Sequence, residues 1–94
     1  MNINKIKSYI GFAIKSNALV YGVDSIREKR VFIVIYSNSL AQSSKQRCVS
    51  LKEKGVDVYE VTDEQMMEII EISNVKAFGI KSQELAKAIK QHLA

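Results

Sequence analysis

Six consecutive apolar or aromatic residues at positions 31–36, VFIVIY, constrain the fold of this chain more than any other feature. Most of them are β-branched, basic residues precede the run, and Ser37-Asn38-Ser39 follows it. A run without polar alternation between turn signals is typical of a strand that is buried on both faces. Because such a strand needs helices on both sides, the run predicts a three-layer α/β/α sandwich with this strand at its centre.

The rest of the chain alternates between helical and strand patterns. Helical spacing of apolar residues occupies 4–15, a single turn at 26–29, residues 40–54, and the segments that follow Thr62 and Ser82. Strand patterns occupy 18–21, 31–36, 56–61 and 75–80. This order predicts one domain over residues 1–94, with a four-stranded sheet that is largely parallel or mixed.

Several residues are predicted to set the limits of these elements. Asn17 and Gly55 are expected to end helices, and Gly79 is expected to mark a close approach of two segments. The expected helix caps are Asp24 or Ser25, Ser39, Thr62 in a capping box with Gln65, and Ser82.

The side chains of the central strand are expected to divide between two cores. Ile33 and Ile35 are predicted on one face, and Phe32 and Val34 on the other, all buried. Elsewhere, Cys48 is expected as a core thiol, Met66 as core filler, and His92 as an exposed residue without a role.

Composition limits the classes of function. The net charge of +4 and a pI near 9.3 give a modest preference for polyanionic partners. One cysteine excludes an intramolecular disulfide, and with one histidine it cannot complete a zinc site. No apolar run reaches the roughly 20 residues of a membrane-spanning helix and no signal-peptide pattern is found, so we expect a cytoplasmic protein.

The charges are distributed unevenly along the chain. Residues 1–30 carry a net charge of +4, residues 31–61 of +1, residues 62–72 of −4, and residues 73–94 of +3. We therefore expect a positive potential where the N-terminal third and the C-terminal segment meet. The acidic block is expected to face elsewhere.

Three segments resemble a known family. GFAIKSNALVYG at residues 11–22 resembles the first helix and strand of the ribosomal L-seven-Ae family of kink-turn RNA-binding proteins, where a pattern of the kind A-x-[KR]-[AST]-G-[KR]-x-x-x-G occurs. RVFIVIYSNSLAQSSKQRCVSLKEKGVDVYEV at 30–61 is similar to the family's central strand, turn, long helix and third strand, and VKAFGIKSQELAKAI at 75–89 resembles its last strand and helix. The bacterial YlxQ-like members are most similar in length. The resemblance implies the same α/β/α fold and binding of structured RNA.

The chain departs from the family at two places. Members that grip kink-turns carry an N-E-x-x-K pattern just after the glycine, on a longer second helix, whereas this chain has Asp24, Ser25 and Glu28 at the matching positions. The family's glycine after the fourth helix is also missing from MMEIIEISNV at residues 66–75. The resemblance therefore implies the fold together with a degenerate RNA-recognition motif.

The resemblance also implies which residues form the RNA-binding edge. They are Lys15, Ser16, Asn17, Gly22, Asp24, Ser25, Arg27, Lys29 and Arg30. Lysine and arginine would neutralise phosphates, and groups around Gly22 would approach base edges of a bent RNA. The basic residues fit a solvated charged rim as well, Asp24 fits a helix cap, and Asn38 with Ser39 fits either a helix start or a phosphate-binding turn.

An enzyme is not expected. A nucleophile needs a neighbouring base, but the only histidine is close to the C-terminus, and no glycine-rich phosphate loop is found. The sequence therefore predicts a non-catalytic protein without cofactors that binds structured RNA, such as ribosomal RNA, in association with the ribosome. The alternative is a protein-interaction or assembly domain that has kept the fold and lost RNA binding. The oligomeric state stays open.

Overall fold

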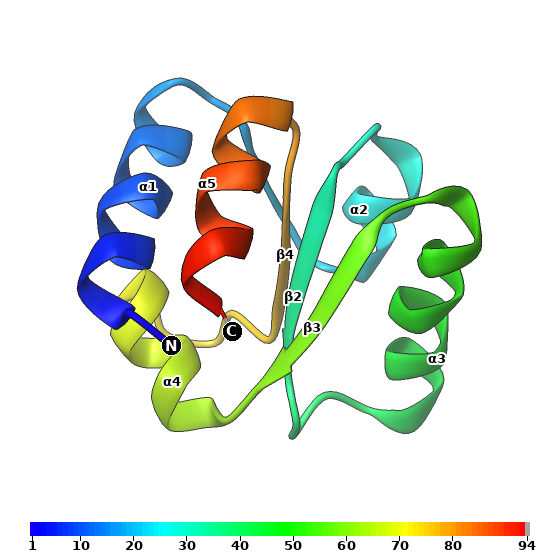
Figure 1. Ribbon diagram of the computed structural model, residues 1–94. Coiled ribbons are helices and arrows are strands. Elements are labelled where there is room, and N and C mark those ends of the chain that lie inside the picture. The colour runs from blue at the N-terminus through cyan, green and yellow to red at the C-terminus, as the bar shows by residue number, and fades with distance from the viewer. Residues whose placement is uncertain (94) are drawn as a thin grey trace.

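The computed structural model describes residues 1–93, which form helices on both faces of one sheet (Figure 1). In chain order the elements are α1 (Ile3–Lys15), β1 (Leu19–Tyr21), α2 (Val23–Glu28), β2 (Ile33–Ser37), α3 (Gln42–Ser50), the 3₁₀ turn η1 (Leu51–Lys54), β3 (Asp57–Val61), α4 (Asp63–Ile70), β4 (Ala77–Ile80) and α5 (Gln83–Leu93). No helix in this part of the chain is long and apolar enough to cross a membrane.

The strands form a mixed sheet in the order β1-β4-β2-β3. β2 and β3 are parallel, and β4 is antiparallel to both of its neighbours, β1 and β2. Helices α1, α4 and α5 cover one face, and α2 and α3 cover the other (Figure 1). The predicted α/β/α sandwich is therefore confirmed, with every residue of β2 buried between the two helical layers.

The side chains of β2 alternate between two cores as a strand requires. Ile33 and Ile35 belong to the cluster under α1, α4 and α5, whereas Val34 and Tyr36 belong to the cluster under α2 and α3. Phe32 was predicted on the face of Val34, but it packs, partly buried, against the first cluster. The prediction is wrong because the strand begins only at Ile33, so its alternation does not extend to the residue before it.

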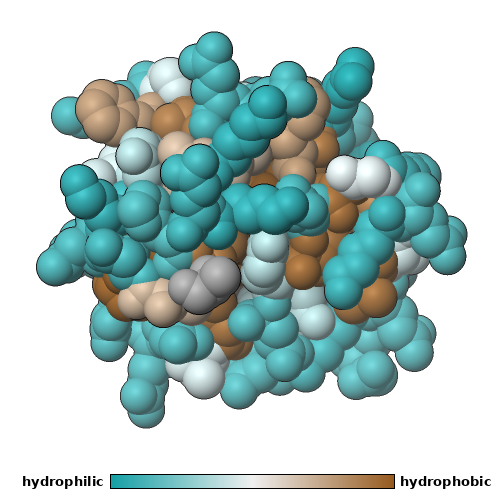
Figure 2. Space-filling view, viewed as in Figure 1, coloured by the Kyte–Doolittle hydropathy of each residue, from teal (hydrophilic) through white to brown (hydrophobic). Residues whose placement is uncertain are grey.

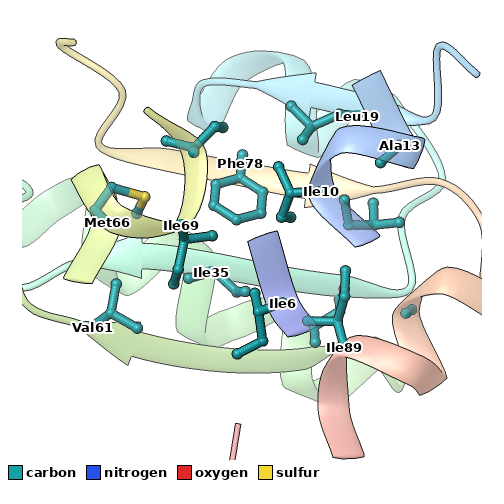
Figure 3. Packing of buried hydrophobic residues seen from close by; sticks show 14 residues of the cluster. Ile6, Ile10, Ala13, Leu19, Ile35, Val61, Met66, Ile69, Phe78 and Ile89 are labelled. Atoms are coloured by element: carbon teal, nitrogen blue, oxygen red, sulfur yellow. The ribbon is translucent and has the colours of Figure 1, made fainter. Parts of the chain in front are cut away.

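The larger core is centred on the sheet face that α1, α4 and α5 cover. Figure 3 shows Phe78 of β4 among isoleucines from several elements, with Ile10 of α1 and Ile69 of α4 beside its ring. Gly79 marks the close approach predicted for it, since a Cβ there would lie 2.9 Å from Cγ1 of Val31. Cys48 is fully buried in the smaller core, and burial raises the pKa of its thiol.

Several helix ends are as predicted. The Thr62 hydroxyl and the Gln65 side chain form the reciprocal capping box of α4, and Ser82 accepts a hydrogen bond from the backbone N–H of Leu85 at the start of α5. Asn17 and Gly55 adopt the left-handed conformation after α1 and η1. Local hydrogen bonds fix these helix ends, so the sequence alone was sufficient to predict where the helices begin and end.

Other helix ends differ from the prediction. Ser39 does not cap α3, which begins after Ala41 without a side-chain cap. Neither Asp24 nor Ser25 caps α2, because the helix begins at Val23, three residues before the predicted turn at 26–29, and Gly22 is its N-cap residue. His92 is half-buried and its ring stacks on Tyr9, with ring centroids 6.0 Å apart, so it is not the idle exposed residue that was expected.

Candidate nucleic-acid interface

The ends of β1 and β2 and the beginning of β4 meet at one end of the sheet, the lower end in Figure 1. Gly22, directly after β1, donates its backbone N–H to the carbonyl of Ala77 over 3.0 Å. Ser37, the last residue of β2, donates its N–H to the carbonyl of Lys76 over 2.8 Å. These bonds hold the β1–α2, β2–α3 and α4–β4 connections together, and we call this the cleft end.

A cluster of polar side chains reinforces the cleft end. The Asp63 carboxylate accepts hydrogen bonds from the hydroxyls of Ser37 and, over 2.7 Å, of Ser39. Lys76 Nζ lies 3.2 Å from the same carboxylate and donates to Ser39 Oγ over 2.7 Å. Ser37 is fully buried, while Asp63 and Lys76 are about half exposed. Ser39 is held away from the start of α3 by these bonds, which explains why it is not the helix cap.

The same cluster keeps Asp63 ionised. Hydrogen bonds from Ser37, Ser39 and Lys76 lower the pKa of its carboxyl group from 3.8 to about 2. At neutral pH the carboxylate therefore balances the positive charge of Lys76. The cluster fixes the connections on which the neighbouring cleft is built.

A cleft of about 510 Å³ lies between the β1–α2 and α4–β4 connections. Its walls include the side chains of Tyr21, Leu40, Ile72 and Val75, and Asn74 and Lys76 add polar groups. Tyr21 and Ile72 are 42% and 41% exposed. Apolar walls with a few polar groups suit a ligand that has a flat apolar face and a polar edge.

Gly22 borders the cleft with its backbone. Its φ of 84° and ψ of 150° are a conformation that only glycine adopts readily. A Cβ at this position would meet no atom within 4 Å, so the backbone conformation requires the glycine and crowding does not. The open space above the backbone lets a ligand approach it closely.

The α4–β4 connection turns without any glycine. Glu71, which follows α4, has a φ of 54°, and Asn74 has a φ of 67°. Asparagine tolerates this left-handed conformation better than glutamate does. The α4–β4 connection can therefore turn and line the cleft although it lacks the glycine that the L-seven-Ae family has after its fourth helix.

The predicted site residues lie at both ends of the sheet. Gly22 lines the cleft, and Asp24 and Ser25 follow it in the first turn of α2. The Asp24 side chain is 88% exposed, and its carboxylate lies 3.4 Å from Nη1 of Arg47. Arg27, near the end of α2, lies in a hollow with Asp24 between α2 and α3 and also borders the opposite end of the sheet.

The other predicted residues lie at the opposite end of the sheet. They are Lys15, Ser16, Asn17, Lys29 and Arg30. The carbonyl of Ala18 accepts the N–H of Lys81, and the N–H of Phe32 bonds to the carbonyl of Ile80, so both connections border the carboxyl end of β4. Three residue steps along β4, roughly 10 Å, separate this end from Gly22. The structure therefore does not bring the predicted residues together in one patch.

Two of these residues have a local structural role. The Ser16 hydroxyl donates to the carbonyl of Phe12 over 2.8 Å, and Asn17 takes a φ of 57° directly after it. Both features end α1, as polar residues commonly do at helix ends.

Most residues of the cleft carry no recognisable signal in the sequence. Tyr21, Ile72, Asn74 and Lys76 line the cleft but were not among the predicted site residues. They become neighbours because β4 pairs with β1 as well as with β2. The one sequence signal for the cleft was Tyr21 at the end of a strand, and an aromatic residue at a strand end is too common to indicate a site by itself.

Comparisons with known proteins add information on the fold alone. No family model and no curated protein matches the chain. A solved structure described as a protein with unknown function from Bacillus halodurans is similar, with a TM-score of 0.76 and 18% sequence identity. The similarity covers 93% of this chain and 94% of that chain.

Proposed function

We propose that this chain is a non-catalytic RNA-binding protein that recognises structured, kink-turn-like RNA with its cleft end, in association with the ribosome. The observation that carries the proposal is the open backbone of Gly22 beside the apolar cleft. The resemblance to the L-seven-Ae family implies base recognition around this glycine. A bent RNA exposes unstacked bases, which have the flat face and polar edges that such a cleft suits.

The groups at the cleft divide the task of recognition. Tyr21 and Ile72 offer exposed apolar surface against which a base face packs. The Asn74 amide both donates and accepts hydrogen bonds, so it suits a base edge. Lys76 is balanced by Asp63, so the cleft end alone offers little positive charge for phosphates.

Crosslinking to cellular RNA, followed by sequencing, tests the proposal. Tyr21→Ala combined with Ile72→Ala is expected to reduce the crosslinked RNA strongly, because both side chains line the cleft. The matched control is Phe12→Ala with Val49→Ala, which removes exposed apolar side chains elsewhere and is expected to change little. Equal crosslinking by the two variants would contradict base recognition in the cleft.

A protein-interaction or assembly domain is the second candidate, and the exposed Tyr21 and Ile72 favour it. Apolar surface beside a cleft suits a protein partner as well as a base. Salt separates the two candidates, because an RNA bound through phosphates is released as the salt concentration rises. A partner held by apolar contacts stays bound under the same conditions.

A further inference from the structure

A second hollow, of about 330 Å³, lies at the end of the sheet opposite the cleft. It is formed where the α2–β2 connection lies beside the turn from η1 into β3, near the top of Figure 1. The charged residues in its lining are Arg27, Lys29, Arg30 and Lys54, and the lining contains no aspartate or glutamate. In Figure 2, hydrophilic residues cover most of the face seen in the same view.

None of the four cations takes part in a salt bridge in the part of the chain that the structure describes. Arg27 and Lys54 also line the neighbouring hollow between α2 and α3, which contains Asp24 and Glu28. The guanidinium of Arg30 lies instead over the ring of Phe32, 5.6 Å from its centroid. Like charges gathered in one hollow repel each other, so a bound anion would relieve that repulsion.

The floor of the hollow is apolar. Ile26, Val31 and Leu51 are buried beneath it. A low-dielectric wall under charges of one sign concentrates their field in the hollow, which strengthens the attraction for an anion. Lysine and arginine on such a surface suit the phosphates of a nucleic-acid backbone.

We propose that this hollow binds backbone phosphates of RNA, separately from the cleft, so that the chain contacts RNA at both ends of its sheet. The inference rests on the proposed function only for the choice of RNA as the polyanion. Lys54 joins Lys29 in this site although 25 residues separate them in the sequence. The cleft end contributes base contacts, and the hollow contributes the charge that the cleft end lacks.

The test uses a straight RNA duplex, which offers phosphates without unstacked bases. Log affinity is measured against log salt concentration for the full chain and for Lys29→Glu with Lys54→Glu. Loss of two phosphate contacts is expected to flatten the slope by about 1.4–1.8. The control, Lys5→Glu with Lys87→Glu, makes the same change in net charge on the exposed sides of α1 and α5 and is expected to leave the slope nearly unchanged.

Three outcomes would overturn the inference. If both variants flatten the salt slope equally, and each keeps a native circular dichroism spectrum, the RNA is attracted by the basic surface as a whole. If the full chain does not bind the duplex at low salt, no phosphate site exists. Stronger displacement of the bound duplex by polyglutamate than by unlabelled duplex at equal charge concentration would assign the hollow to an acidic protein instead. The cleft variant Tyr21→Ala with Ile72→Ala keeps the proposals separate, because it is expected to retain the full slope even if base recognition fails.

Discussion

At the scale of single residues, Asp63 shows how one carboxylate organises the candidate site. It accepts hydrogen bonds from Ser37 at the end of β2 and from Ser39 in the β2–α3 connection, and it faces the ammonium of Lys76 in the α4–β4 connection. By its position in the first turn of α4, Asp63 also complements the helix dipole. The contacts give it a second role, because they hold the walls of the cleft in place.

The low pKa of Asp63 predicts how stability depends on pH. Its carboxyl has a pKa of about 2 in the folded protein and 3.8 without these contacts, so its stabilisation is complete above pH 4 and is lost as the pH falls towards 2. Asp63→Asn is expected to flatten the fall in the free energy of unfolding across this range. Urea unfolding at several pH values measures it, with Glu64→Gln as control. Identical pH profiles for the parent and Asp63→Asn would contradict the prediction.

At the scale of elements, β2 is the strand that links the rest of the sheet and both cores. It pairs with β3 on one side and β4 on the other, and its residues reach both cores. The short helix α2 depends on its surroundings, since one turn and a half is too short to be stable by itself. Its buried Ile26 anchors it to the sheet face that β2 shares.

The position of β2 predicts a large effect of truncation. Ile33 is fully buried, so Ile33→Ala is expected to lower the free energy of unfolding by about 2–5 kcal/mol. Val49→Ala, at an exposed position on α3, is expected to change it by about 0.5 kcal/mol or less. Urea denaturation at neutral pH compares the two variants with the parent. A parent-like midpoint for Ile33→Ala would be inconsistent with the central position of the strand.

At the scale of the whole molecule, the two ends of the sheet differ in chemistry. The cleft end has apolar walls and an ion pair between Lys76 and Asp63, whereas the cations at the opposite end form no salt bridge within residues 1–93. The charge distribution along the chain predicts a positive region where the N-terminal third meets the C-terminal segment. Lys15 and Lys81 border this opposite end, and Lys29, Arg30 and Lys54 extend it.

We predict that this chain binds a standard kink-turn more weakly than typical L-seven-Ae proteins do. The carboxylate of Asp24 only accepts hydrogen bonds, whereas the asparagine of the family pattern also donates them. Ser25 is shorter than the glutamate of that pattern, and Glu28 stands where the pattern has a positively charged lysine. Two lost base contacts, each worth about 1–3 kcal/mol, would move a nanomolar affinity to micromolar or weaker. Titration against a kink-turn RNA at physiological salt measures it.

The family pattern itself supplies a gain-of-binding control. Asp24→Asn with Ser25→Glu and Glu28→Lys restores N-E-x-x-K on α2 and is expected to tighten binding. Nanomolar binding by the parent that Asp24→Ala abolishes would mean that the altered residues still read the RNA. The prediction would then be wrong.

The sequence alone determined the order of the elements and the burial of the central strand from Ile33 to Tyr36. The apolar run at 31–36, the helical stripes and the capping box of Thr62 and Gln65 predicted the α/β/α class, because periodicity and capping are local properties. Only the tertiary structure decided that β4 lies between β1 and β2, since strand pairing joins residues far apart in the chain. That pairing placed Gly22 and Lys29 at opposite ends of the sheet and assembled the cleft from residues that no local pattern connects.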